Sequence, residues 1–263
     1  MSAEPTALAA APREMLARVR FLLSDLDDTL SERGRVGSSV IAALERLQAA
    51  GIKTIVVTGR PAGWADAIAR LWPIAGVVGE NGALSYWRDA AGALERRYYF
   101  DARKLDELMR TAEETLKFEK GLKLALDQPY RVADVAVDFR EDVGPFPIAL
   151  AERIRDHFRA AGFQATVSSI HVNAWAGGYS KASTATDLLA KAFAVSDFAG
   201  ETLYVGDSPN DEPMFEAFPL SAAVANVREF LPGMNKRPRW IMRAERGAGF
   251  VELAEALIAA RSA

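Results

Sequence analysis

The chain has 263 residues, of which 50% are hydrophobic and 25% are charged, a balance typical of a soluble globular protein with one large core or two modest ones. Its formal net charge of −3 shows no basic excess of the kind that binding to nucleic acid or to an anionic membrane needs. The absence of cysteine excludes disulfides and thiol nucleophiles and fits a reducing compartment. We therefore expect a cytoplasmic protein with no nucleic-acid, membrane or obligate protein partner.

No apolar run approaches the roughly 20 residues that span a bilayer. Residues 1–12 are rich in Ala and Pro, but they lack the basic start and the continuous apolar stretch of a secretory signal. We expect residues 1–18 to form a flexible extension before the folded part of the chain.

Two separate parts of the chain alternate short apolar runs with segments of helical periodicity. The runs predict strands at residues 21–24, 52–57, 77–78, 202–205 and 222–225, and the periodic segments predict helices at residues 38–51, 61–72, 180–193 and 250–260. Because the strands are apolar throughout, we expect parallel pairing with helices on both faces of the sheet. The pattern predicts an α/β fold with a Rossmann-like, doubly wound parallel-sheet core, formed by residues 19–87 and 176–263.

The segment between these parts has a different pattern of apolar and polar residues and is far too long for a loop. Residues 101–120 and 148–161 have helical periodicity, whereas residues 132–139 alternate apolar and acidic side chains as a half-exposed strand does. Residues 165–175 favour further strands. An antiparallel sheet with one solvated face accounts for this alternation, so we expect an inserted α+β cap domain at residues 88–175.

Carboxylates gather where the first predicted strand ends. Asp25 and Asp27 belong to a D-x-D-x-T motif just past residues 21–24, in the crevice where open parallel sheets bind ligands. At this position Asp25 can attack a phosphorus atom while Asp27 handles the proton. A polar junction between a strand and a turn would also account for this motif taken alone.

Two further motifs supply groups that could bind a phosphoryl group. Thr58, Gly59 and Arg60 follow the second strand, where a hydroxyl and the backbone donors of a helix start can hold phosphate oxygens. Lys181 begins a later helix and could neutralise both the phosphate and a carboxylate nucleophile. Taken alone, the first motif also fits a plain helix cap, and Lys181 also fits a solvated surface.

A second carboxylate motif, G-D-S-x-N-D, follows the strand expected at residues 202–205. Its acidic residues are Asp207 and Asp211, and Asn210 is a further candidate for phosphate binding. Mg²⁺ prefers oxygen ligands and usually takes one or two carboxylates from a protein, which Asp25 and Asp207 can supply. The motif predicts a magnesium site between two strand ends, although a capped helix start would also explain it.

Together and in this order, the four motifs resemble those of the haloacid dehalogenase superfamily of phosphohydrolases, from Phe21 onward along nearly the whole chain. The insertion between the second and third motifs is similar to the subclass of Cof-type phosphatases, sucrose-phosphate phosphatase, mannosyl-3-phosphoglycerate phosphatase and phosphomannomutase. Residues 80–83 also match the pattern before the cap of this subclass. The resemblance implies a phosphoric monoester hydrolase that uses Mg²⁺ and acts on a sugar phosphate or a similar small phosphorylated metabolite.

The resemblance also implies a role for each carboxylate. The nucleophile that forms an aspartyl-phosphate matches Asp25, and the general acid and base matches Asp27. Mg²⁺ would be held by the Asp25 carboxylate, the backbone carbonyl of Asp27 and the Asp207 carboxylate. Asp211 would orient a metal-bound water.

Outside the carboxylates, Thr58 and Lys181 match the residues that bind the phosphoryl group in this superfamily. Asp28 stands where glycine is often found, and this departure is neutral because the side chain need not face the phosphate. Selectivity should lie in the cap, because a common phosphate site cannot distinguish leaving groups. The candidate cap residues are Arg131, Asp138, Arg140, His171, Asn173 and Trp175.

Other functions share part of this pattern. A bacterial receiver domain also surrounds a phosphorylated Asp with acids, a Thr and a Lys, but it is much shorter and its acceptor follows the third strand. A phosphomutase of the same superfamily, which returns the phosphoryl group to the sugar, is not separated from a phosphatase by the core motifs. A non-catalytic protein that binds phosphorylated ligands would usually have lost Asp25, Asp27 or Lys181, and all three are present.

Overall fold

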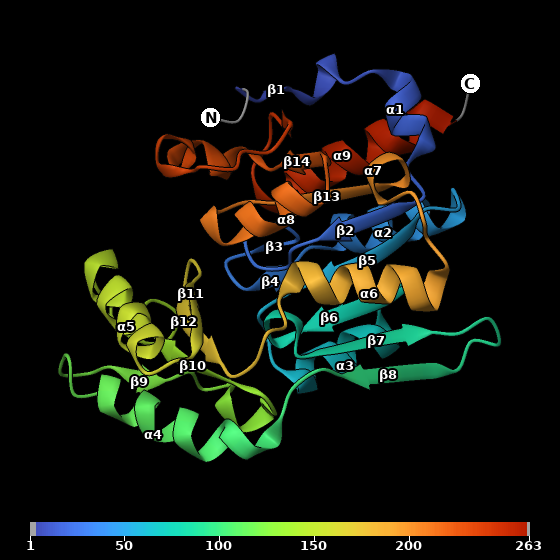
Figure 1. Ribbon diagram of the computed structural model, residues 1–263. Helices are drawn as coiled ribbons and strands as arrows, with labels where there is room; N and C mark the ends of the chain where they lie inside the picture. Colours follow the sequence, from blue (N-terminus) through green and yellow to red (C-terminus); the bar gives the residue numbers. More distant parts are fainter. Residues whose placement is uncertain (1–3, 262–263) are drawn as a thin grey trace.

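The computed structural model describes residues 4–261, which form a large sheet, a small sheet and a short hairpin (Figure 1). The strands of the large sheet are β1 (Thr6–Ala7), β2 (Phe21–Ser24), β5 (Lys53–Val57), β6 (Gly76–Gly79), β7 (Leu84–Arg88), β8 (Leu94–Tyr98), β13 (Thr202–Gly206), β14 (Leu220–Ala223) and β15 (Trp240–Ile241). In space their order is β1-β15-β14-β13-β2-β5-β6-β7-β8. Neighbours from β1 to β6 are parallel, and β7 and β8 continue the sheet antiparallel. The predicted α/β fold class is confirmed.

Alternate side chains of the central strands enter two cores on opposite faces of the large sheet. The helices around it are α1 (Arg13–Arg18), α2 (Ser38–Ala49), α3 (Ala62–Leu71), α6 (Lys181–Phe193), α7 (Phe198–Glu201), α8 (Glu212–Ala217) and α9 (Arg246–Arg261). Leu22 of β2 packs in the core that contains side chains of α1, α2, α3 and α9, whereas Phe21 and Leu23 pack with α6 and α8. A strand covered on both faces must be apolar throughout, which is the pattern that predicted the parallel sheet.

The amino-terminal segment is part of the fold, so the expectation of a flexible extension over residues 1–18 is wrong for the described residues. β1 pairs with β15 at the edge of the large sheet, with Thr6 opposite Trp240, and α1 packs against α9. Leu8 and Leu16 are buried in the core. The contacts that order this segment come from the other end of the chain, and a local pattern carries no sign of them. Residues 1–3 lie outside the described residues.

A second sheet, entirely antiparallel, is inserted between the two halves of the large one. Its strands are β9 (Lys123–Leu124), β10 (Asp134–Asp138), β11 (Gln164–Val167) and β12 (His171–Trp175), in the order β11-β12-β10-β9. The helices α4 (Leu105–Thr115) and α5 (Ile148–Ala160) pack on one face and enclose a separate apolar core. We call this sheet with its two helices the cap (Figure 1).

Two expectations about the insertion differ from the structure. Residues 88–175 were expected to form the cap, but β8 pairs with β7 in the large sheet, so the elements of the cap begin after Tyr98. β10 was expected to have a solvated face, but it is buried along its whole length. Its apolar side chains join the core beneath α4 and α5, whereas Asp134 is hydrogen-bonded to Asn81 of the large domain. The polar face is dry because the cap rests on the large sheet there.

Candidate active site

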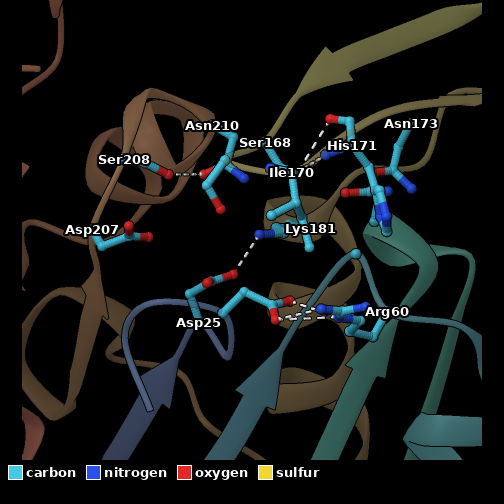
Figure 2. A pocket seen from close by; sticks show the side chains of 14 residues that line it. Asp25, Arg60, Ser168, Ile170, His171, Asn173, Lys181, Asp207, Ser208 and Asn210 are labelled. Atoms are coloured by element: carbon cyan, nitrogen blue, oxygen red, sulfur yellow. Dashed lines mark hydrogen bonds and ion pairs between the residues drawn. The ribbon is translucent and has the colours of Figure 1, made fainter. Parts of the chain in front are cut away.

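The cavity between the sheet and the cap is lined by loops that follow the carboxyl ends of parallel strands. Figure 2 shows Asp25 beyond β2, Arg60 beyond β5 and Asp207 beyond β13, with Lys181 projecting from the start of α6. His171 approaches from the cap. Open parallel sheets bind ligands at this edge because strand ends and helix starts converge there.

An ion pair between Asp25 and Lys181 lies at the centre of the cavity. Nζ of Lys181 donates to Oδ1 of Asp25 at 2.7 Å, and both side chains are almost completely buried. Lys181 is held in place because the Ser180 side chain caps α6 by accepting the backbone N–H of Ser183 at 3.1 Å. The backbone N–H of Asp25 donates to Val205 in the neighbouring strand at 2.9 Å, so the strand pairing positions the carboxylate.

The electrostatics of this centre favour an added cation. Burial raises the pKa of Asp25 to about 7; Lys181 opposes this, and the charges of Asp211 and Asp27 add to it. The pKa of Asp207 is also raised well above its ordinary value, first by burial and then by the charges of Asp211 and Asp25. Burial alone would lower the pKa of Lys181, but its carboxylate neighbours raise it. One lysine therefore faces several buried carboxylates, which disfavours their joint ionisation until more positive charge arrives.

The loop after β13 is shaped by Asp211, which does not line the cavity. Its Oδ2 accepts the backbone N–H of Asp207 at 2.9 Å and of Ser208 at 3.3 Å, and its Oδ1 accepts the hydroxyl of Tyr204. A side chain at Gly206 would collide with this carboxylate. Asp211 therefore holds the loop from behind, and its Oδ1 lies 3.7 Å from Nζ of Lys181. Its expected role in orienting a metal-bound water stays a prediction.

Arg60 joins the sheet to the cap through its guanidinium. It donates to both oxygens of Asp27, with Nη2 2.9 Å from Oδ1 and Nε 3.0 Å from Oδ2, and Nη2 lies 2.7 Å from Oε1 of Glu141. Nη1 lies 3.4 Å from Oδ2 of Asp127. Burial alone would lower the pKa of Arg60, but Asp27 and Glu141 raise it. Arg60 was expected to bind phosphate, and the structure instead commits it to protein carboxylates.

The turn after β6 fastens the cap to the large sheet. Glu80 accepts backbone N–H groups from Ala62 of α3 at 2.8 Å and from Ala133 of the cap at 2.7 Å. Burial, with the charge of Asp134, raises the pKa of Glu80 to about 7, although the backbone donors lower it. Asn81 donates to Asp134 at 3.0 Å from a backbone with φ of 56°, a conformation that non-glycine residues adopt only when their surroundings enforce it.

The structure separates the predicted site residues into groups. Those that line the cavity are Asp25, Asp27, Gly59, Arg60, His171, Asn173, Lys181, Asp207 and Asn210. Thr58 lies just outside, where its Oγ1 accepts the backbone N–H of Arg60 at 3.0 Å. Arg131 is buried and bound by Asp127 and Asp134, so it stabilises the cap and does not face a substrate. Arg140 lines an adjoining cavity.

The remaining cap candidates also lie in the interface. Trp175 is buried, and its Nε1 donates to the carbonyl of Tyr179 at 3.1 Å. Asp138 accepts backbone N–H groups from Arg140 at 2.9 Å and from Glu141 at 2.8 Å, and so it orders the loop that presents both side chains.

Several residues of the cavity were not identified from the sequence. Ser168, Ser169 and Ile170 form the turn between β11 and β12, and Figure 2 shows Ile170 directed towards Lys181. Oε2 of Glu141 lies 2.9 Å from Nε2 of His171, which the alternating pattern had placed on an ordinary strand face. The only local signal for this turn was a polar Ser-Ser pair between two strand-like segments, a pattern that predicts a turn but no site.

The donor set at the strand ends fits the predicted Mg²⁺. Among residues 4–261, no three His, Asp or Glu side chains gather as a metal-binding group. Asp25 and Asp207 face the cavity together, and Asn226 orients Asp207 by donating to its Oδ2 at 3.1 Å. Mg²⁺ suits such a site because it keeps several waters and takes one or two carboxylates.

The space around these groups has two parts. The inner cavity, which contains Asp25 and Lys181, measures about 30 Å³ and has room for little more than water. The outer cavity measures about 300 Å³ and shares Asp27, Arg60 and Ile170 with the inner one. A volume of this size lies at the lower end of the range for small-molecule sites.

The fold and the site together define an α/β protein with a buried carboxylate and lysine cluster beneath a cap. Residues 22–124 match the family model of the haloacid dehalogenase-like hydrolases, and the resemblance predicted from the motifs is confirmed. No curated protein matches the chain. The family match supports a hydrolase.

The chain has the same fold as several solved structures of this superfamily. A putative HAD/COF-like hydrolase from Plasmodium vivax is 17% identical with a TM-score of 0.70, and the match covers 94% of this chain and 99% of that one. The C-terminal domain of trehalose-6-phosphate phosphatase from C. albicans is 14% identical with a TM-score of 0.73, covering 97% and 99%. The sucrose-phosphatase from Synechocystis, solved with sucrose and phosphate, is 18% identical with a TM-score of 0.61, covering 91% and 98%. At these identities the likeness shows the fold.

Within residues 4–261, no helix combines the length and the apolar character needed to cross a membrane.

Proposed function

We propose that this protein is a Mg²⁺-dependent phosphomonoester hydrolase that acts through an aspartyl-phosphate on Asp25. The observation that carries the proposal is the buried ion pair between Asp25 and Lys181 at 2.7 Å, beneath a cap and beside a second carboxylate, Asp27. The expected substrate is a sugar phosphate or a similar small phosphorylated metabolite. Trehalose-6-phosphate phosphatase and sucrose-phosphatase share the fold, which is consistent with this class of substrate.

In the first step, an oxygen of Asp25 attacks phosphorus, and the bond from phosphorus to the leaving oxygen breaks. Lys181 neutralises negative charge on the nucleophile and on the phosphoryl oxygens. Asp27 gives a proton to the leaving oxygen, so the alcohol departs neutral. The bidentate contact with Arg60 holds the Asp27 carboxylate in one orientation at the mouth of the outer cavity.

In the second step, water attacks the phosphorus of the aspartyl-phosphate, and Asp27 takes up the proton of that water. The bond between phosphorus and Asp25 breaks, which releases inorganic phosphate and restores the Asp25 carboxylate and the protonated Asp27. Asp25, Asp207 and the backbone carbonyl of Asp27 would hold Mg²⁺. The ion supplies positive charge to the phosphoryl oxygens and relieves the repulsion between the carboxylates.

The proposal is tested by phosphate release from p-nitrophenyl phosphate with Mg²⁺, after chelation, and with Ca²⁺ in its place. We expect turnover only with Mg²⁺, because Ca²⁺ takes more ligands at longer distances. Asp25→Asn should abolish turnover because an amide cannot form the acyl-phosphate. The matched control is Asp66→Asn on the exposed face of α3. Among the described residues, the Asp66 carboxylate forms hydrogen bonds and an ion pair with Arg70 and with no other residue. Turnover that survives in Asp25→Asn would exclude Asp25 as the nucleophile.

A further inference from the structure

The outer cavity occupies the place of the leaving group if Asp27 is the proton donor. It opens beside Asp27 and adjoins the inner cavity, with which it shares lining residues. One wall comes from the large domain, at the turn of the hairpin formed by β3 (Ser31–Glu32) and β4 (Arg35–Val36). The opposite wall comes from the cap, at Arg140 and the turn containing Ile170. A substrate whose phosphoryl group reaches Asp25 would place the rest of its structure between these walls.

Each carboxylate of this cavity contacts a protein cation. Asp27 and Glu141 share Arg60, at 2.9 Å and 2.7 Å. Asp28 is bound by Arg246 at 3.2 Å. The three carboxylates of the lining therefore all have a cationic partner.

Two guanidinium groups of the same cavity have no carboxylate partner among the described residues. Within residues 4–261, Arg33 makes no hydrogen bond or ion pair, and Arg140 has no carboxylate within ion-pair distance. The Nε of Arg140 donates to the carbonyl of Phe146 at 3.1 Å, and its guanidinium lies 5.1 Å from the centre of the Phe139 ring. These contacts orient Arg140 and leave its charge uncompensated. Guanidinium groups bind carboxylates and phosphates with paired hydrogen bonds.

We infer that Arg33 and Arg140 form a binding site for a second anionic group, so that the substrate is a phosphomonoester whose alcohol part carries a carboxylate or another phosphate. The inference rests on the proposed function and narrows its substrate class. One arginine comes from the hairpin and the other from the cap, so an anion held by both would also favour the closed arrangement of the two domains. A neutral sugar phosphate would leave both charges unpaired.

The test uses matched ligands that differ by one anionic group. Glycerol 3-phosphate is compared with 3-phosphoglycerate for a carboxylate, and fructose 6-phosphate with fructose 1,6-bisphosphate for a second phosphate. We expect kcat/KM to favour the anionic member of at least one pair by about tenfold or more, since a hydrogen bond to a charged group contributes about that much. The pair that shows the preference identifies which anion the site takes.

Arg33→Gln and Arg140→Gln should each reduce this preference by about tenfold and leave the rate on p-nitrophenyl phosphate within about twofold, because that substrate has no second anion. The matched control is Arg35→Gln, in the same hairpin but outside the lining of the cavity, which should leave the preference unchanged. A preference that persists in both single variants, or an equal loss in Arg35→Gln, would overturn the site.

A binding measurement tests the anion site independently of the proposed hydrolase activity. Calorimetric titration of the same ligands is made on proteins that all carry Asp25→Asn, so that turnover cannot interfere. The wild type could hydrolyse no phosphomonoester while the anionic member of a pair binds more tightly than its neutral counterpart, and this difference could depend on Arg33 and Arg140. In that case the anion site stands and the hydrolase proposal fails. Equal binding of both members of both pairs would overturn the anion site whatever the activity.

Discussion

The two sides of the cavity are positioned in different ways. On the sheet side, Asp25 and Asp207 directly follow strands and Lys181 begins a helix, so each is placed by the local end of one element. On the cap side, His171 and the turn containing Ile170 lie in another sheet, and their distance from Asp25 depends on contacts that cross the interface. The groups for the chemistry are therefore placed by the ends of single elements of the large sheet, whereas the groups that select the substrate are placed by the contacts between the cap and the large domain.

The two sides also differ in how their buried charges are paired. Asp25 and Asp207 have raised pKa values because they are buried together with a single lysine. At the junction, Arg60 and Arg131 each donate to more than one carboxylate. The buried carboxylates of the sheet side thus favour the binding of a cation. The arginines of the junction are already engaged with carboxylates, and these contacts hold the cap.

The change with the largest expected effect removes a group on the sheet side. Asp27→Asn should lower turnover by about 10²–10⁴-fold on a substrate with a poor leaving group, because both proposed steps need a proton transfer at this position. The loss should be smaller for p-nitrophenyl phosphate, whose leaving group departs without a proton. Steady-state rates on the two substrates make the measurement. An equal loss on both would contradict a role for Asp27 as proton donor.

A second change breaks the junction and replaces none of Asp25, Lys181 or Asp207. Arg60→Gln should lower the free energy of unfolding by about 3 kcal/mol, because it strips Asp27, Asp127 and Glu141 of a shared buried partner. Turnover should also fall, since Asp27 loses its orientation. Urea unfolding measures the first effect. The control Arg70→Gln removes an exposed pair on α3 and should cost well under 1 kcal/mol. Equal stability of the two variants would show that Arg60 does not hold the cap.

The smallest expected effect concerns the charge of the sheet side and follows from the raised pKa of Asp25, to about 7. Without metal, the folded protein keeps this proton up to about pH 7, whereas an unfolded Asp loses it near pH 4. Between these values the unfolded state binds fewer protons, so this contribution to stability is present below about pH 4 and is lost as the pH rises to about 7. Mg²⁺ binds the ionised carboxylates, so it should raise Tm by a few degrees at pH 8 and by much less at pH 5.

Thermal unfolding with Mg²⁺ and with a chelator at both pH values measures this difference. Asp25→Asn supplies the control, because it removes the titrating group and should remove most of the Mg²⁺ effect. Without metal at pH 8, this variant should be at least as stable as the wild type. A Mg²⁺ shift of equal size at pH 5 and pH 8 would contradict a site formed by carboxylates with raised pKa values.

The sequence by itself determined the central parallel strands β2, β5, β6, β13 and β14 of the large sheet and the groups at their ends. β2 and β5 were readable because strands covered on both faces must be apolar throughout, and their ends were marked by polar motifs within a few residues. Asp25, Lys181 and Asp207 were found because parallel strands bring their carboxyl ends to the same edge, so the order of the motifs along the chain already implied their proximity.

Only the tertiary structure decided how the rest of the molecule meets this edge. The pairing of β1 with β15 and the burial of Asp134 depend on partners far away in the chain, and no local periodicity records them. The same holds for Arg60, whose motif indicated phosphate but whose guanidinium is held by Asp27 and Glu141. Periodicity reports which face of an element is covered by apolar neighbours, but a polar face looks the same in the sequence whether water or another domain covers it.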